Sequence, residues 1–195
     1  FRKEIFDIKN NKKIIFLIII GSIPLITVGY FLYKTNIIHV IRDIQVIAWT
    51  TLIFGFLLYF ADKNKLDKKI SNNLNFKTIF YIGLFQTLAL IPGVSRAGIT
   101  ITAARILKFN RVDASRISFL LSIPALAGAS TLGLKDILEQ SIEFNYFIFL
   151  AVIFSFLFSY FTVKFFLKYI NKFSLNIFVY YRVFVAIILF VIIYN

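Results

Sequence analysis

The apolar stretch of residues 78–107 is interrupted by the sequence Pro92-Gly93-Val94-Ser95-Arg96-Ala97-Gly98. The segment before it, residues 78–91, is too short to cross a bilayer, and such lengths are typical of re-entrant or buried segments. Residues 99–107 form a second short apolar segment. Two short helices joined by a polar turn predict a re-entrant hairpin, since irregular backbone at membrane depth must be buried in protein or line a wet cavity. One long tilted span carrying Arg96 is the alternative.

The rest of the chain predicts an all-α integral membrane protein. Of its 195 residues, 59% are hydrophobic, and the mean hydropathy is +0.84. A soluble domain is closer to 45–50% apolar. Five apolar runs are long enough to span a membrane. We expect membrane-spanning helices at residues 14–32, 44–61, 117–134, 144–163 and 177–194.

The distribution of basic residues supports the hairpin. The chain carries 22 Lys and Arg against nine Asp and Glu, a net charge of +13. If residues 78–107 enter and leave on one side, nearly all basic loop residues fall on the side of the N-terminus. If that stretch crosses once, they divide almost evenly between the two sides. The positive-inside rule therefore favours a hairpin that enters from the cytoplasm.

Composition also excludes several classes of function. The excess of basic residues lies mostly in short gaps between apolar runs, so we expect membrane topology and not nucleic-acid binding to explain it. The chain has no Cys and one His. Disulfides, thiolate metal sites, Cys nucleophiles and imidazole clusters are therefore excluded within this sequence.

Arg96 is the most informative single residue. A charge inside an apolar region costs about 2.5–3.5 kcal/mol on insertion scales and marks a functional candidate. Ser95 can cap the second short helix, whose free N–H groups attract anions. The fork of a guanidinium pairs with two phosphate oxygens, and Gly93 and Gly98 allow a ligand to approach the backbone. The pattern predicts a phosphate site in which Thr100 also donates its hydroxyl.

Other conspicuous residues have simpler interpretations. Arg182 is expected to extend to the cytoplasmic interface from a helix start. A solvated loop that orients the protein is expected to hold Arg105, Lys108, Arg111 and Arg116. A group of small residues follows Pro124 and predicts a close-packing helix face rather than a cofactor site. These residues are Ala125, Ala127, Gly128 and Ala129.

One segment of the chain closely resembles a known family. Residues 86–100, Gln-Thr-Leu-Ala-Leu-Ile-Pro-Gly-Val-Ser-Arg-Ala-Gly-Ile-Thr, resemble the second signature motif of the undecaprenyl-diphosphate phosphatase (bacitracin-resistance) family. Residues 118–124, Gly128-Ala129 and Tyr181-Arg182 resemble further features of that family. Two positions depart from its pattern: Ala97 stands where a second Ser is usual, and Arg116 where an acidic residue is common.

The resemblance implies an inverted-repeat fold with six spans and two hairpins. The chain, residues 1–195, is then a single membrane domain in which residues 12–61 end the first repeat and residues 78–195 form the second. The chain does not begin with Met, and we expect it to be N-terminally incomplete. The first hairpin, its glutamate-rich motif and the first span would precede Phe1, and the chain alone would be inactive.

The function implied is hydrolysis of undecaprenyl diphosphate to undecaprenyl phosphate and phosphate, which recycles the lipid carrier of cell-wall (peptidoglycan) synthesis and underlies bacitracin resistance. The resemblance places the protein in the bacterial plasma membrane as a multi-pass enzyme with a site open to the outer face. Its partners would be the polyprenyl diphosphate and membrane lipids, not nucleic acid, and homo-oligomer formation is left open. The alternative is an inverted-repeat transporter or flippase for a phosphate-bearing lipid or anion.

The site residues follow from the motif and the chemistry together. Arg96 and Ser95 are the expected catalytic residues, with Ser95 either a hydrogen-bond donor or the nucleophile. The substrate-binding set is expected to be Gly93, Arg96, Ala97, Gly98 and Thr100. A divalent cation, Mg²⁺ or Ca²⁺, is expected on ligands from the segment before Phe1, and no metal ligand is expected within this chain.

Overall fold

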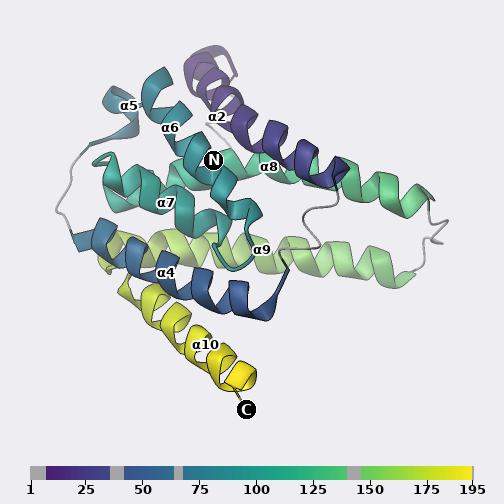
Figure 1. The fold of residues 1–195 in the computed structure, drawn as a ribbon. Helices are drawn as coiled ribbons and strands as arrows, with labels where there is room; N and C mark the ends of the chain where they lie inside the picture. Colours follow the sequence, from purple (N-terminus) through teal and green to yellow (C-terminus); the bar gives the residue numbers. More distant parts are fainter. Residues whose placement is uncertain (1–7, 36–41, 64–67, 140–145, 195) are drawn as a thin grey trace.

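The computed structural model describes residues 8–35, 42–63, 68–139 and 146–194, in which every regular element is a helix. The long helices are α2 (Ile8–Lys34), α4 (Ile44–Lys63), α8 (Arg111–Glu139), α9 (Tyr146–Lys172) and α10 (Asn176–Tyr194). The short helices are α5 (Ile70–Asn73), α6 (Phe76–Thr87), the 3₁₀ turn η1 (Leu88–Leu90) and α7 (Arg96–Ile106). Figure 1 shows α6 and α7 between α2 and α4, with α7 packed against α8.

Among the described residues, five helices are long and apolar enough to cross a membrane, which confirms the five predicted spans. Most of them extend beyond the predicted boundaries, because polar residues at their ends continue the helix. The first two residues of the predicted span 144–163 lie outside the described residues. The inverted-repeat arrangement stays a prediction.

Residues 68–109 form a helical hairpin that contains the predicted residues 78–107, and its re-entry into the membrane stays a prediction. The backbone N–H of Lys68 donates to the carbonyl of Lys108 (3.1 Å), and the N–H of Asn110 donates to the carbonyl of Lys68 (3.1 Å). The chain therefore enters α6 and leaves α7 at the same place. At 1.5 Å per residue, α6 and α7 are each about 17–18 Å long, well short of a bilayer core of about 30 Å. One long tilted span is excluded.

Contacts along α2 give the direction of α6. A Cβ on Gly83 would collide with the carbonyl of Gly21, so both glycines allow the two helices to touch through their backbones. Further along, a Cβ on Gly29 would lie 3.6 Å from Leu90. Because the two helices run in the same direction through these contacts, α2 and α6 start at the same side of the bundle.

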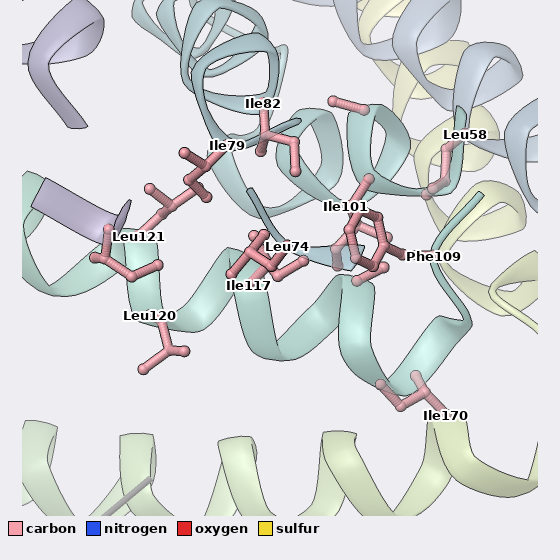
Figure 2. Packing of buried hydrophobic residues seen from close by; sticks show 14 of the residues in the cluster. Leu58, Leu74, Ile79, Ile82, Ile101, Phe109, Ile117, Leu120, Leu121 and Ile170 are labelled. Carbon is pink, nitrogen blue, oxygen red and sulfur yellow. The ribbon is translucent and has the colours of Figure 1, made fainter. Parts of the chain in front are cut away.

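Apolar side chains of the hairpin form the centre of the core. Ile79, Ile82 and Ile101 are fully or almost fully buried, and they pack with Ile117 and Leu121 of α8. Figure 2 shows these side chains pointing toward one another from α6, α7 and α8. By contrast, no residue in the apolar 18-residue stretch of α9 is buried against the described part of the chain. Among the described residues, the hairpin is therefore packed more closely than α9.

Asp62, at the end of α4, joins the ends of four elements. Its carboxylate pairs with Arg105 of α7 (3.1 Å) and Arg111 of α8 (2.8 Å), and it accepts from the backbone N–H of Leu175 between α9 and α10 (3.1 Å). The expected solvated loop is wrong for Arg105, which is only 3% exposed. Because α7 returns to the end of α4, Arg105 meets a buried carboxylate there instead of water.

Replacing Asp62 by Asn should destabilise the protein strongly. The change leaves the buried Arg105 without its counter-charge, and breaking a buried ion pair in this way costs about 3–5 kcal/mol. Thermal unfolding in detergent measures the loss. Asp43→Asn is the control, because Asp43 is exposed and only accepts from the nearby N–H of Gln45. Equal melting temperatures for the two variants would show that the Asp62 cluster does not stabilise the fold.

The hairpin also predicts a labelling pattern. The chain contains no Cys, so single Cys substitutions at the exposed positions Asn72, Lys108 and Lys135 are unambiguous probes. Only position 135 should react with a membrane-impermeant thiol reagent added to intact cells, since 72 and 108 lie at the ends of the hairpin, on the basic side that we expect to face the cytoplasm. Labelling of 108 but not 72 from outside would contradict the hairpin.

Candidate active site

The helix break at residues 91–95 is held by α4. Ile91 is extended (φ −79°, ψ 126°), as expected for a residue before Pro. The hydroxyl of Thr50 donates to the carbonyl of Pro92 (2.6 Å), and that of Thr51 donates to the carbonyl of Gly93 (3.3 Å). Thr50 lies about 20 Å from the Lys63 end of α4 and about 9 Å from the Ile44 end at 1.5 Å per residue. The break therefore lies deep within the span.

Gly93 can be only glycine here. Its φ is +87°, a conformation that side chains with a Cβ rarely adopt. An added Cβ would also collide with the Thr50 hydroxyl and lie 2.7 Å from the carbonyl of Ile47. The turn thus packs directly on the backbone of α4.

Ser95 caps α7 from a strained backbone. Its hydroxyl oxygen accepts from the N–H of Gly98 (3.3 Å), as an N-cap residue does. Its φ is +67°, unusual for a residue other than glycine. Strained residues of this kind cost about 1–3 kcal/mol and cluster at functional sites. The N–H groups of Arg96 and Ala97, at the first turn, have no intrahelical partner and face the helix start.

Arg96 points into an apolar cavity. The cavity has a volume of about 430 Å³ and lies between α2, η1 and α8. The Nη1 atom of Arg96 is buried and has no hydrogen-bond partner among the described residues. No carboxylate lines this cavity, so within the described chain the charge of Arg96 has no counter-ion.

The small residues of α8 line the same cavity. Ala125, Gly128 and Ala129 all face it, and a Cβ added to Gly128 would meet no described atom within 4 Å. The expectation of a close-packing face is therefore wrong for these residues in the described part of the chain. Their small size leaves open space beside Arg96.

Arg182 of α10 is a site residue that sequence reasoning assigned to the interface. The side chain is 7% exposed, and its Nη2 donates to the carbonyls of Gly93 (2.5 Å) and Val94 (2.8 Å). The expected extension to the interface is wrong, because α10 packs on α4 and places Arg182 against the helix break. The only signal in the sequence was that Tyr181-Arg182 resembles a feature of the family.

The expected binding residues lie around two cavities. A second cavity of about 330 Å³ is lined by Gly93, Ser95, Ala97, Gly98 and Arg182 among others. Arg96 does not line it but faces the first cavity. The start of α7 thus lies between two cavities with one arginine in each. Thr100 is fully buried and lines neither, and its hydroxyl bonds to that of Ser118 (2.6 Å) and to the carbonyl of Arg96 (2.9 Å).

The described residues do not fit a divalent cation. They contain no group of three or more Asp, Glu or His side chains that could hold a metal ion. Their buried or partly buried carboxylates are already engaged: Asp62 and Asp113 pair with arginines, and Asp136 accepts from the hydroxyl of Tyr33 (2.6 Å). None of them lines either cavity.

Comparison with known proteins shows the family of the chain. The chain matches the family described as bacitracin resistance protein BacA over residues 1–188. It is 64% identical to the undecaprenyl-diphosphatase of Pelagibacter ubique, with 100% of this chain and 77% of that protein covered. It is 42% identical to the undecaprenyl-diphosphatase of Elusimicrobium minutum (97% and 75% covered) and 36% identical to undecaprenyl-diphosphatase 4 of Bacillus thuringiensis (93% and 71% covered). The fold, the helix break with its unpaired arginine and these identities together establish that the chain belongs to the BacA family.

Proposed function

We propose that this protein is a membrane phosphatase that hydrolyses undecaprenyl diphosphate to undecaprenyl phosphate and orthophosphate. One observation carries the proposal: Arg96 stands at the start of α7, next to the helix break held by α4, and its Nη1 atom is buried with no partner among the described residues. A buried charge without a partner is costly and calls for an anion. The relatives named undecaprenyl-diphosphatase supply the identity of that anion.

The reaction adds water across the bond between the two phosphates. The terminal phosphorus gains an oxygen from water, the bridging P–O bond breaks, and the electron pair leaves with undecaprenyl phosphate. Catalysis of such transfers rests mostly on positioning and on charge stabilisation. The guanidinium of Arg96 would bind two oxygens of the reacting phosphate, and the free N–H groups of α7 would stabilise the charge that develops on them.

Ser95 has two candidate roles. As a donor, its hydroxyl would bind a phosphate oxygen while its own oxygen keeps the bond from Gly98. As the nucleophile, that oxygen would attack phosphorus, and water would then release the phosphoryl group. The N-cap hydrogen bond to the Ser95 oxygen supports the donor role, because it occupies a lone pair of that oxygen.

Ser95→Gly should separate stability from activity. Glycine adopts a positive φ without strain, and losing the cap costs only a few tenths of a kcal/mol, so the unfolding free energy should rise by about 1 kcal/mol. Activity should fall at least tenfold if Ser95 is a donor and vanish if it is the nucleophile. Ser95→Ala is the control, since it loses the hydroxyl but keeps the strain. Full turnover in both variants would remove Ser95 from the site.

The lipid tail of the substrate would lie beside Arg96. The cavity that Arg96 faces is otherwise lined almost entirely by apolar and small side chains of α2, η1 and α8. An isoprenoid chain needs an apolar surface, and these helices would offer it directly from the bilayer. The position of the break nearer the Ile44 end of α4 supports access from the outer face of the plasma membrane.

The requirement for a divalent cation remains a proposal, and the described residues provide no group of ligands for it. Mg²⁺ or Ca²⁺ would neutralise phosphate charge. No carboxylate is among the described residues that line the two cavities, and the proposed role of Arg96 does not depend on a metal ion. Treatment with EDTA followed by readdition of each ion tests the requirement. Homo-oligomer formation likewise remains a proposal, for which cross-linking in membranes is the direct measurement.

Proteoliposomes distinguish hydrolysis from transport. The natural protein is reconstituted with undecaprenyl diphosphate carrying a ³²P label in its terminal phosphate. We expect one orthophosphate released for each undecaprenyl phosphate formed. Movement of the intact lipid between leaflets without release of phosphate would overturn the proposal in favour of a transporter or flippase.

A further inference from the structure

The last turns of α9 carry three lysines on one face. Lys164, Lys168 and Lys172 are exposed and follow one another at intervals of four residues, which places them about 6 Å apart along the helix. Ile170, two residues from both Lys168 and Lys172, is buried in the core, and Figure 2 shows it pointing from α9 toward α8. Since residues two apart on a helix point in nearly opposite directions, these lysines, the lysine face, point away from the rest of the described chain.

No acidic residue accompanies the lysine face. α9 contains no Asp or Glu, and none of the three ammonium groups pairs with a carboxylate among the described residues. Lys164 has the ring of Tyr160 beside it, with 6.0 Å between Nζ and the ring centroid. Within the described chain, three positive charges thus lie uncompensated along about 12 Å of helix.

Ordinary explanations account for only part of this arrangement. A cation stabilises the partial negative charge at a helix C-terminus, but the effect falls off within the last turn. Lys172 is the last residue of α9, whereas Lys168 and Lys164 lie one and two turns earlier. The positive-inside rule explains on which side of a membrane basic residues gather, and not why they align on one face. The alignment therefore points to a binding partner.

The lysine face lies where α9 would leave the hydrocarbon core of a membrane. No charged residue precedes Lys164 in α9, and the stretch from Tyr146 to Val163 is about 27 Å long at 1.5 Å per residue. That length nearly fills a hydrocarbon core of about 30 Å, so the lysine face falls in the headgroup layer beyond it. The phosphates of membrane lipids lie in that layer.

Apolar side chains continue the same face toward the middle of the membrane. Phe161 and Phe165 lie three residues before Lys164 and Lys168, and residues three apart share a helix face. Both rings, and that of Phe158 one turn earlier, are exposed. The face therefore presents apolar surface and then positive charge, in the order in which a phospholipid presents its acyl chains and its headgroup.

We propose that the lysine face and the phenylalanines before it bind an anionic phospholipid of the surrounding bilayer. The ammonium groups contact the phosphate and the charged headgroup, and the acyl chains pack on the phenylalanine rings. Basic residues near a membrane surface attract anionic lipids in this way. A zwitterionic phospholipid carries no net charge and gains no such attraction. This site lies apart from both cavities and does not depend on the proposed phosphatase function.

Quenching of fluorescence by brominated lipids measures which lipid occupies this face. The sequence contains one Trp, so the pair Trp49→Phe and Phe165→Trp moves the only tryptophan to a position beside the lysines. This reporter protein is reconstituted into vesicles with brominated phosphatidylglycerol or brominated phosphatidylcholine. The extent of quenching gives the binding constant of the anionic lipid relative to the zwitterionic one at position 165. Trp49 of the unaltered protein is exposed on the uncharged stretch of α4 and serves as the comparison.

Phosphatidylglycerol should bind about fivefold or more tightly than phosphatidylcholine at position 165, because each nearby lysine adds to the attraction. Replacing all three residues of the lysine face by Gln should reduce this ratio to about one. High salt should also reduce it in the reporter protein with its lysines intact, which tests the attraction without a further variant. At Trp49 the ratio should stay close to one.

A charge-matched control separates the lysine face from the overall charge. Lys68, Lys69 and Lys77 are exposed at the start of the hairpin, and replacing these three by Gln removes the same charge elsewhere. This control should keep the preference for phosphatidylglycerol at position 165. Melting temperatures in detergent establish that each variant is folded.

Three results would overturn the proposal. The first is a ratio near one at position 165 while the lysine face is intact. The second is a ratio that survives the loss of the lysine face, or that falls equally in the charge-matched control. The third is fluorescence at position 165 that neither brominated lipid quenches, because protein and not lipid would then cover the face.

Discussion

Arg96→Lys should lower turnover of undecaprenyl diphosphate by about 100-fold or more, the usual cost of removing one donor that stabilises transition-state charge. Lysine keeps the charge but is a single point donor, so it cannot reproduce the two parallel hydrogen bonds of a guanidinium to phosphate. Because Arg96 makes no side-chain hydrogen bond to the described protein through Nη1, the fold should tolerate the change. The melting temperature in detergent should stay close to wild type.

Arg116→Lys is the matched control for this prediction. Arg116 is 44% exposed and lies 3.8 Å from Asp113 on the same helix, so lysine can replace it there. Release of orthophosphate from the purified variants gives kcat and KM for each. Turnover by Arg96→Lys within a fewfold of wild type would remove Arg96 from the reacting phosphate.

Gly93→Ala should disrupt the site and the fold together. The new methyl group would collide with the Thr50 hydroxyl and approach the carbonyl of Ile47 to 2.7 Å, in a residue whose φ is +87°. Backbone strain and overpacking each cost about 1–3 kcal/mol, so the expected loss of unfolding free energy is about 2–6 kcal/mol. Activity should be lost as well, since the turn that carries Ser95 and Arg96 must move.

Gly133→Ala isolates the cause of that loss. Gly133 lies in α8, and an added Cβ there meets no described atom within 4 Å. Alanine should stabilise that helix by about 1 kcal/mol. Thermal unfolding of both variants in detergent gives the comparison. A melting temperature of Gly93→Ala equal to that of Gly133→Ala would show that the turn does not pack on α4 as described.

Local features of the sequence were sufficient to predict the hairpin. The short apolar lengths on either side of Pro92 and Gly93 cannot span a bilayer, and the basic residues required both ends on one side. The hydrogen bonds between Lys68 and residues 108–110 show that the two short helices form a hairpin, while its entry into the membrane from the cytoplasm stays a prediction. These signals depend on residues close together in the chain, which is why they can be recognised without a structure.

The division of the site into two cavities could not be predicted from helix periodicity. Ser95 is the N-cap of α7 and has a non-helical backbone (φ +67°, ψ 114°), so the 100° spacing of helical residues does not give its direction. The adjacent residues Ala97 and Gly98 line the same cavity as Ser95, whereas Arg96 lines the other. The packing of α10 and α2 around the start of α7 decides which cavity each residue faces.

The roles of Arg182 and Arg105 could not be predicted in this way. Arg182 bonds to residues almost ninety positions earlier, and Arg105 of the hairpin pairs with Asp62 at the end of α4. Both arginines lie near helix ends, where extension into solvent is the ordinary outcome. Only the packing of α10 on α4, and of α7 against the end of α4, buries them.

The central claim is that a phosphate binds at the start of α7, and solid-state NMR measures this directly. Arg96-Ala97 is the only Arg-Ala pair in this sequence, so ¹³C-carbonyl Arg with ¹⁵N Ala selects the Ala97 amide. The protein is loaded with a non-hydrolysable methylene-bridged analogue of undecaprenyl diphosphate, and ³¹P–¹⁵N dipolar coupling gives the distance. The account predicts a phosphorus about 4 Å from that nitrogen, as an N–H to phosphate hydrogen bond requires. An Ala97 signal unaffected by ³¹P in protein saturated with the analogue would contradict it.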